Sequence, residues 1–260
     1  MPTDAIPGDR KRTPARVSHQ LPVQRFLQPD DVTCGPTCLK KVYHFYGRDV
    51  PLEQVLEGVD RDQEGGTLAV NLAIAALGRG FRARIISYNL RLFDPTWARL
   101  GREGLIEKLR LRIPHLRDAK SERAARAYVQ FLEAGGEMAF VELTPRLLKG
   151  ILDSNRPILS GLSATYLYRM PRERHDPKTH ELLDDDVAGD PVGHFVVISG
   201  YSQRGRRFTV RDPSAHAPTD RQGRVEVEAQ RLINAILLGD LTYDAVLLEL
   251  WLPEEEDSAE

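Results

Sequence analysis

The sequence has little cysteine, two residues in 260, and few apolar runs of any length. Two cysteines cannot build the disulfide framework that is typical of small secreted proteins. The longest strongly apolar stretches, residues 235–238 and 246–251, are far shorter than the roughly 18 residues that a membrane-spanning helix needs. The N-terminal residues also lack the apolar segment of a secretory signal. We therefore expect a cytoplasmic protein without a membrane span.

Neither sign of charge dominates the chain. Lys and Arg total 36 against 38 Asp and Glu, which gives a formal net charge of -2. This balance provides no overall basic field for a polyanion, so nucleic acid is not expected as a partner. The sequence contains no Gly-rich phosphate loop and no zinc-protease helix motif, and we expect no cofactor and no metal.

The remaining composition is that of a folded chain. A hydrophobic content of 41% in 260 residues is enough for a sizeable core and excludes a wholly disordered protein. Residues 1–20 mix prolines and basic residues without apolar periodicity and predict a flexible arm, and residues 253–260 predict an acidic tail. Because the sequence between them has no internal repeat, we expect one domain over residues 21–252.

Periodicity and turn residues predict an α+β fold, with helices first and an antiparallel sheet afterwards. Residues 94–136 are Arg-rich and predict two amphipathic helices that are broken near Pro114, as an apparent insertion. The other predicted helices begin near Cys34 and at Pro51, and cover residues 67–77, 145–153 and 227–238. The predicted strands cover residues 23–27, 81–85, 138–143, 157–162, 193–201, 207–211 and 245–251.

Cys34 has the sequence context of a nucleophile. It lies at the predicted first turn of a helix, after a turn and before Gly35 and Pro36, which suit a tight helix entry. Unpaired N–H groups and the positive end of the helix dipole favour a thiolate over a thiol at this position. The alternative for Cys34 is a small buried side chain of the core.

A base and an orienting acid are available downstream. His194 is the best placed of the 7 histidines, because it opens the most strand-like segment of the chain. Asp212 follows the predicted partner strand and is held extended by Pro213. If the two strands pair, both residues lie near one edge of the sheet, where the acid can fix the imidazole tautomer, as a catalytic triad requires. Gln28, six residues before Cys34, is a candidate oxyanion donor.

These residues carry a resemblance to a known family. The segment QPDDVTCGPTCL at residues 28–39, then GHFVV at residues 193–197 and DP at residues 212–213, resembles the papain-like cysteine peptidases that process the double-glycine leader peptides of bacteriocins. The resemblance is to the free-standing branch of that family, since the sequence shows no transporter domain or nucleotide-binding domain. It implies a papain-like fold in which Cys34 is the nucleophile, His194 the base, Asp212 the orienting acid and Gln28 the oxyanion donor.

The resulting hypothesis is a thiol hydrolase that cleaves a peptide or amide bond through a thioester acyl-enzyme. Two alternatives use the same residues differently: an acyl or peptidyl transferase that passes the acyl group to an amine, and a non-catalytic peptide-binding module. A peptide or amide is the expected substrate in each case. Whether a peptide ligase or a transporter acts beside this protein is left open by the sequence.

Two weaker signals favour a structural interpretation over a functional one. Cys34 and Cys38, four residues apart, could be a metal-binding or redox pair, but no second pair with zinc-like spacing accompanies them. We therefore expect Cys38 to pack in the core. The acidic residues 184–190 lack the ligand pattern of a calcium loop and predict a solvated loop. Because this loop shortly precedes His194, a second interpretation is a lid over the cleft or a site for basic substrate residues.

Overall fold

The computed structural model describes residues 17–62, 66–176, 179, 182–239 and 245–253. Most of the expected N-terminal arm and of the expected acidic tail lies outside these residues. Within the described parts, no helix is both long enough and apolar enough to cross a membrane.

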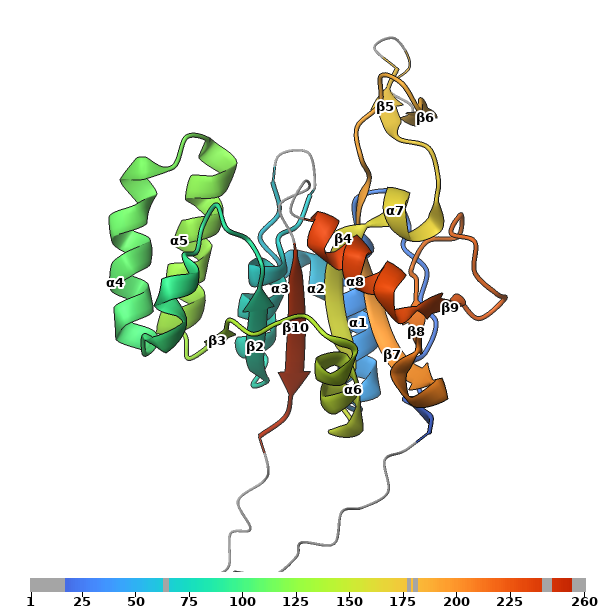
Figure 1. The fold of residues 1–260 in the computed structure, drawn as a ribbon, viewed down its shortest axis with the longest axis horizontal. Coiled ribbons are helices and arrows are strands. Elements are labelled where there is room, and N and C mark those ends of the chain that lie inside the picture. Colours follow the sequence, from blue (N-terminus) through green and yellow to red (C-terminus); the bar gives the residue numbers. More distant parts are fainter. Residues whose placement is uncertain (1–16, 63–65, 177–178, 180–181, 240–244, 254–260) are drawn as a thin grey trace, which may run out of the picture.

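Helices cover both faces of one eight-stranded sheet (Figure 1), so the expected α+β fold is confirmed. A separate two-stranded pair, β5 with β6, projects from one end of the molecule. The strands are β1 (His19–Gln20), β2 (Arg82–Ser87), β3 (Glu137–Ala139), β4 (Ile158–Ser163), β5 (Glu173–His175), β6 (Leu182–Asp184), β7 (Gly193–Ser202), β8 (Arg207–Arg211), β9 (Arg224–Glu228) and β10 (Val246–Trp251).

The helices include three short 3-10 segments among longer α-helices. They are α1 (Cys34–Phe45), α2 (Leu52–Glu57), α3 (Ala69–Leu77), η1 (Pro95–Arg99), α4 (Arg102–Arg112), η2 (Ile113–His115), α5 (Ala119–Glu133), α6 (Pro145–Asp153), α7 (Ala164–Tyr168), η3 (Gln203–Gly205) and α8 (Ala229–Leu237).

The strand order of the sheet is β3-β2-β10-β4-β7-β8-β9, and β1 pairs with β7 outside this path. All neighbours are antiparallel except β2 and β3, which are parallel. The last strand of the chain, β10, therefore lies between β2 and β4 and joins the two halves of the sheet.

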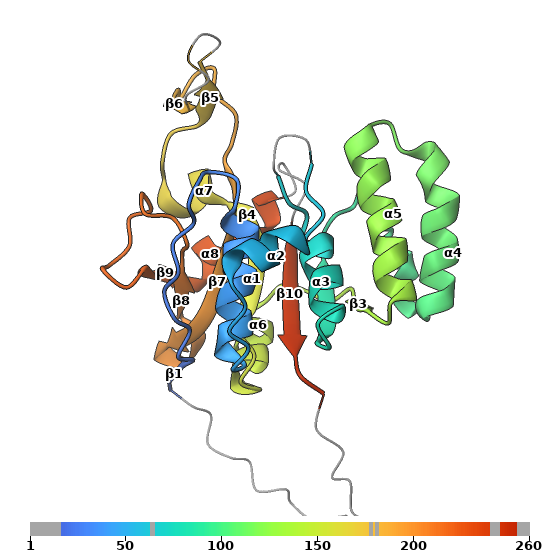
Figure 2. The same cartoon turned by 180° about the vertical axis from the view of Figure 1, so that it is seen from behind.

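The two faces of the sheet carry different helices. Helices α1, α2 and α3 cover one face (Figure 2), and α6 and α8 cover the other. Strands β4 and β7 lie between α1 and the α6–α8 side; all of β4 is buried, and β7 is buried from Phe195 to Tyr201. Burial on both faces agrees with the apolar residues of this pair, for example Leu159, Val196 and Val197.

The predicted helices of residues 94–136 are confirmed as α4 and α5, and Pro114 lies in the 3-10 turn between them. Helix α5 is capped by Asp118, whose carboxylate accepts the N–H of Ser121 at 2.8 Å. The helix pair stands beside the β2–β3 end of the sheet (Figure 1). It contacts the rest of the molecule through α3, so its α5 helix reaches the face on which α1 lies.

The prediction of a strand at residues 23–27 is wrong. The N–H of Leu21 donates to the carbonyl of Ser199 at 2.7 Å, which continues the pairing of β1 with β7 by one residue. Further along β7 this edge is taken by β4, which pairs from Ile198 to Gly193. Residues 23–27 consequently have no free strand edge to join, and they run along the surface without a ladder.

Glycine at position 200 permits the approach of β1. A Cβ atom there would collide with the side chain of Gln20 and the carbonyl of His19, so only the smallest residue lets β1 pair at this point. The pairing of β7 with β8 is also irregular between Ile198 and Gly200. Such a bulge increases local twist at the place where a strand changes partners.

Other boundaries were predicted less well. The helix expected at residues 227–238 begins at Ala229, because Val225 and Val227 belong to β9, where Val227 pairs with Phe208. The strand expected at residues 138–143 is only the three residues of β3. Thr67 does not cap α3, whose N-cap position is Leu68.

Candidate active site

The start of α1 places Cys34 at the end of the sheet where β4 ends and β7 begins. Cys34 is the first residue of the helix, and it is partly exposed. Gly35 packs closely against β7, since a Cβ atom there would lie 3.2 Å from Cδ2 of Phe195. The first N–H groups of a helix have no intrahelical acceptor, so they face any group that binds beside Cys34.

His194 and Asp212 meet across the β7–β8 pair, as the strand pairing predicted from the sequence requires. The last residue of β8, Arg211, pairs with Val197, so that Asp212 emerges toward the first residues of β7. Nε2 of His194 lies 2.9 Å from Oδ1 of Asp212. This contact uses one ring nitrogen of the imidazole and leaves Nδ1 for another partner.

Asp212 is fully buried and its carboxylate is held by three groups. Besides His194, the N–H of Ser214 donates to Oδ1 at 2.7 Å and the hydroxyl of Tyr168 donates to Oδ2 at 2.5 Å. Burial opposes ionisation, but the charge and hydrogen bond of His194, followed by the bonds of Tyr168 and Ser214, lower the pKa of Asp212. The residue is therefore a carboxylate in the folded protein.

Tyr168 was missed in the sequence. It is the last residue of α7, a five-residue helix that the sequence did not predict, and its hydroxyl reaches Asp212 from 44 positions away. Burial and the neighbouring charge of Asp212 raise the pKa of Tyr168, which keeps the hydroxyl a donor. Nothing in the sequence distinguished it from Tyr166, which lies two residues earlier in the same helix.

The charge of His194 follows from its surroundings. Burial of the imidazole opposes protonation, but the charge and hydrogen bond of Asp212, together with the neighbouring Cys34, raise the pKa of His194 from 6.5 to about 10. The imidazole is thus positively charged at neutral pH.

Cys34 and His194 line a common cavity of about 260 Å³. Its floor includes Gly161 and Leu162 at the end of β4, and its rim includes Asp31, Asp62 and residues 66–68. Lys120 of α5 completes the lining, so the helix pair of residues 94–136 supplies one wall. The ion pair of Arg123 with Asp62, at 3.6 Å, ties α5 to the same rim.

Gln28 lies near these residues but outside the cavity lining. Its backbone N–H donates to the carbonyl of Pro213 at 2.9 Å, which fixes it beside Asp212. Its side-chain amide donates to the carbonyl of Asp30 at 2.7 Å, and the amide oxygen is buried without a partner. One N–H of the amide is therefore engaged in the turn, and the role of oxyanion donor stays a prediction.

Cys38 packs in the core, as predicted. It is fully buried, and its thiol donates to the carbonyl of Phe195 at 3.3 Å. Burial raises the pKa of Cys38, so this thiol is unreactive compared with an exposed one. One turn further along α1, the buried Lys41 donates to the carbonyl of Phe26 at 2.7 Å, a contact that sequence reasoning did not foresee.

The acidic residues 184–190 form a mostly exposed turn, in agreement with the predicted solvated loop. The carboxylate of Asp185 accepts the N–H groups of Val187 and Ala188 and also binds Arg174 at 2.8 Å. At the base of this hairpin, Glu173 is close enough to the site to be affected by it. Burial and then the charges of Asp184 and Asp31 raise the pKa of Glu173, whereas His194 lowers it.

The structure brings three of the predicted site residues together. A cysteine at a helix start lies against an antiparallel sheet that carries a histidine bound to a buried aspartate. Among the described residues, no three or more His, Cys, Asp or Glu side chains are placed to hold a metal ion.

No family model matches the chain, and no curated protein is detectably similar to it in sequence. Among solved structures, it is similar to a double-glycine-motif protease from an AMS/PCAT transporter in complex with its leader peptide, with 16% identity, a TM-score of 0.40 and coverage of 89% of this chain and 93% of that chain. It is also similar to the peptidase domain of Streptococcus ComA, a bifunctional ABC transporter. The identity is 13%, the TM-score is 0.41, and the match covers 89% of this chain and 99% of that chain.

Xylellain, a cysteine protease from Xylella fastidiosa, is a further similar structure, with 15% identity, a TM-score of 0.43 and coverage of 92% of this chain and 87% of that chain. These proteins are peptidases of the kind that the sequence motifs resemble.

Proposed function

We propose that this protein is a cysteine peptidase, a thiol hydrolase that cleaves a peptide or amide bond with a Cys34–His194–Asp212 triad. The observation that carries the proposal is the joint position of Cys34 and His194 in one cavity, with Nε2 of His194 bound to the buried Asp212 at 2.9 Å. Burying a carboxylate costs free energy, because the charge loses its hydration. In this proposal the buried Asp212 orients His194 and stabilises its positive charge.

The first half of the reaction forms a thioester. The proton of Cys34 resides on Nδ1 of His194, because Nε2 is held by Asp212. The thiolate attacks the carbonyl carbon of the scissile bond, and the carbonyl oxygen becomes an oxyanion. His194 then donates its Nδ1 proton to the departing nitrogen, the carbon–nitrogen bond breaks, and the amine leaves.

The second half regenerates the thiol. His194, now neutral at Nδ1, removes a proton from water, and the hydroxide attacks the thioester carbonyl. The carbon–sulfur bond breaks, the carboxylic acid is released, and Cys34 returns as the thiolate beside the charged imidazole. Asp212 keeps its charge throughout and holds the tautomer of the ring.

The oxyanion lies beside the start of α1 in this mechanism. The N–H of Cys34 is one donor, and the side-chain amide of Gln28 is the second, through the N–H that does not bind Asp30. A preorganised pair of donors of this kind supplies a large part of the rate enhancement in acyl transfer.

A reducing compartment such as the cytoplasm suits this chemistry. Both cysteines are free, and Cys34 is partly exposed, where oxidation would remove the nucleophile. Cys38, buried nearby, has no such requirement.

Covalent labelling tests the proposal. The intact protein is incubated with a peptide that carries an electrophilic group at its C-terminus, and the adduct is located by mass spectrometry. We expect one adduct on Cys34, no adduct on the Cys34→Ala variant, and unchanged labelling of the matched Cys38→Ala variant. Equal labelling of the Cys34→Ala variant would overturn the assignment of the nucleophile.

Turnover with added amines then separates hydrolysis from transfer. A hydrolase yields the free acid even when an amine is in excess, whereas a transferase yields the amide of that amine. A protein that is labelled at Cys34 only as slowly as a free thiol, and whose labelling does not change in the His194→Gln variant, would be a binding module rather than an enzyme.

A further inference from the structure

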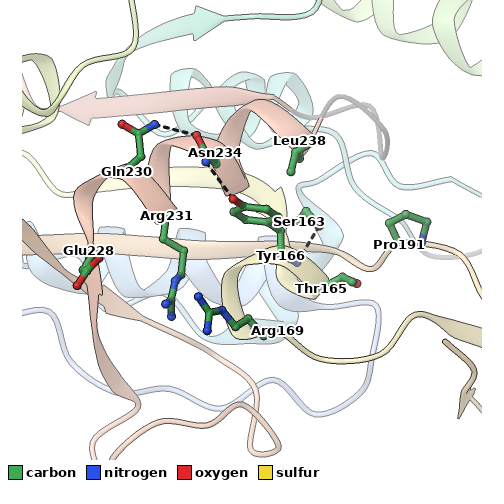
Figure 3. Close-up of a pocket in the computed structure, with 10 residues that line it drawn as sticks. All are labelled: Ser163, Thr165, Tyr166, Arg169, Pro191, Glu228, Gln230, Arg231, Asn234 and Leu238. Carbon is green, nitrogen blue, oxygen red and sulfur yellow. Dashed lines mark hydrogen bonds between the residues drawn. The ribbon is translucent and has the colours of Figure 1, made fainter.

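A second cavity lies on the opposite face of the same strand ends. It has a volume of about 620 Å³ and lies between α7 and α8 (Figure 3). Its lining includes Ser163 at the end of β4 and Pro191 just before β7, whereas the neighbouring Leu162 and Gly193 line the cavity of Cys34. The ends of β4 and β7 thus separate the two cavities.

Two arginines define the chemistry of this second cavity. Arg169 follows α7, Arg231 lies on α8, and their guanidinium groups point toward each other in Figure 3. Neither guanidinium has a hydrogen bond or an ion pair with any other residue in the described part of the chain. Two like charges that converge without an acid repel each other, and an oxyanion between them relieves that repulsion.

The backbone position of Arg169 is set by the end of α7. Arg169 adopts the left-handed conformation, with φ 57° and ψ 42°, at the C-cap of α7. This conformation is common at helix ends, where glycine or asparagine is the usual residue. The residue before it is Tyr168, which binds Asp212. Arg169 therefore projects from a position that is fixed by the catalytic carboxylate.

The remaining walls do not neutralise the arginines. Glu228 lines the cavity, but it forms an ion pair with Arg207 at 4.0 Å. The other polar groups bond to one another and are neutral: Nδ2 of Asn234 donates to the hydroxyl of Tyr166 at 3.0 Å, and Nε2 of Gln230 donates to Oδ1 of Asn234 at 2.9 Å. Tyr166 adds an apolar ring surface.

We propose that Arg169 and Arg231 form a binding site for a carboxylate, and that its occupant is an acidic side chain of the peptide substrate. The guanidinium fork matches a carboxylate through two parallel N–H bonds. The cavity of Cys34 and the cavity of the arginines lie on either side of the ends of β4 and β7, where residues 164–165 bond to Val192. Naming a peptide as the occupant rests on the proposed function, whereas the carboxylate site itself rests on the cavity alone.

Binding is measured on the full chain carrying Cys34→Ala, so that no bond is cleaved. The probe is a capped tripeptide of glutamate, and its matched control is the capped tripeptide of glutamine. We expect the glutamate peptide to bind at least about tenfold more tightly, as charge-assisted hydrogen bonds are worth this much or more. Equal binding of the two peptides would overturn the proposal.

Variants locate the site. In the Cys34→Ala background, Arg169→Gln and Arg231→Gln are each expected to weaken the glutamate peptide about tenfold, without changing the weak binding of the glutamine peptide. Arg231→Lys keeps the charge but loses the fork, so an intermediate loss is expected. Arg48→Gln, which removes an exposed arginine of the loop after α1, is the matched control and is expected to change nothing.

Two further measurements test the folding of the variants and the identity of the ligand. Melting temperatures of all variants show whether each one is folded. Because neither arginine side chain has a hydrogen bond or an ion pair within the part of the chain that the structure describes, we expect no decrease. Succinate as a free dicarboxylate tests the source: binding weaker than that of the peptide supports a peptide occupant, and equal binding overturns the peptide assignment. Failure of Cys34 labelling would remove the proposed function but leave these binding constants unaffected.

Discussion

The two cavities at the ends of β4 and β7 differ in whether their charged side chains are paired within the protein. On the α1 face, His194 and Asp212 form a buried charged pair. The hydroxyl of Tyr168 and the N–H of Ser214 also donate hydrogen bonds to the carboxylate. On the α8 face, Arg169 and Arg231 converge without an acid between them. In the smaller cavity the charge of His194 is paired with Asp212 within the fold, whereas the larger cavity presents the charges of two arginines to a ligand.

This difference matches the different needs of a group that reacts and a group that binds a ligand. A reacting group benefits from partners that fix its orientation before substrate arrives, because no reorganisation is then needed during the reaction. A recognition group benefits from the absence of such partners, because a bond to the ligand does not replace an internal bond. The predictions below alter one cavity and measure both, by labelling of Cys34 and by binding of the glutamate tripeptide.

The largest expected effect is that of His194→Gln. Glutamine fills a similar space but neither accepts the proton of Cys34 nor carries charge, so we expect the rate of labelling by the electrophilic peptide to fall at least about 1000-fold. Binding of the glutamate tripeptide is expected to stay within about twofold of the original value. A labelling rate within tenfold of the unmodified protein would show that His194 is not the base.

The next effect concerns Gln28. We expect Gln28→Ala to lower turnover of a cleavable peptide about 100-fold, the cost of one oxyanion donor. Alkylation of Cys34 by iodoacetamide passes through no oxyanion, and it is expected to change little. Gln28→Glu, which keeps the shape but lacks the N–H, serves as the second variant. Parallel losses of turnover and alkylation would instead indicate a structural role for Gln28.

A third effect is on stability as a function of pH. Because the pKa of His194 in the folded protein is raised above 6.5, its contribution to the free energy of unfolding is complete below that value and declines as the pH rises toward about 10. Between pH 6 and pH 9.5, we expect the free energy of unfolding, measured in urea, to fall by at least about 1 kcal/mol more for the unmodified protein than for the His194→Gln variant. Parallel profiles of the two proteins would contradict the raised pKa.

The smallest effect is expected for Tyr168→Phe, which tests the residue between the two cavities. Loss of the hydroxyl removes one hydrogen bond to Asp212, with an expected cost of about 1–2 kcal/mol in unfolding free energy. Labelling of Cys34 is expected to slow severalfold and to shift its pH profile, since the carboxylate loses a donor. Tripeptide binding at Arg169 is expected to remain unchanged, and a large loss there would mean that Tyr168 also positions the second cavity.

Much of the first cavity could be predicted from the sequence because its residues belong to regular elements with strong patterns. The apolar run after His194 predicted β7, the turn at residues 203–205 predicted its pairing with β8, and this pairing brings His194 and Asp212 together. Helix α6 was predicted to the residue, from Pro145 to Asp153, because proline marks its start.

The second cavity could not be predicted, because nothing local marks it. Helix α7 is five residues long, too short for a periodic signal, and Arg169 lies 62 positions from Arg231. The strand expected at residues 23–27 failed for a similar reason: its alternation was suitable, but whether a strand edge was available depended on β4. Tertiary context decided both cases.

The central position of β10 has a consequence for the order of events during synthesis. Val246–Trp251 joins β2 to β4, so the sheet stays in two parts until these residues, which are made after both β2 and β4, have left the ribosome. Cys34 is made early, but the wall of its cavity that contains Gly161 and Leu162 is fixed to the β2 side only at this late stage. A nascent chain therefore contains Cys34 well before the cavity around this residue is complete.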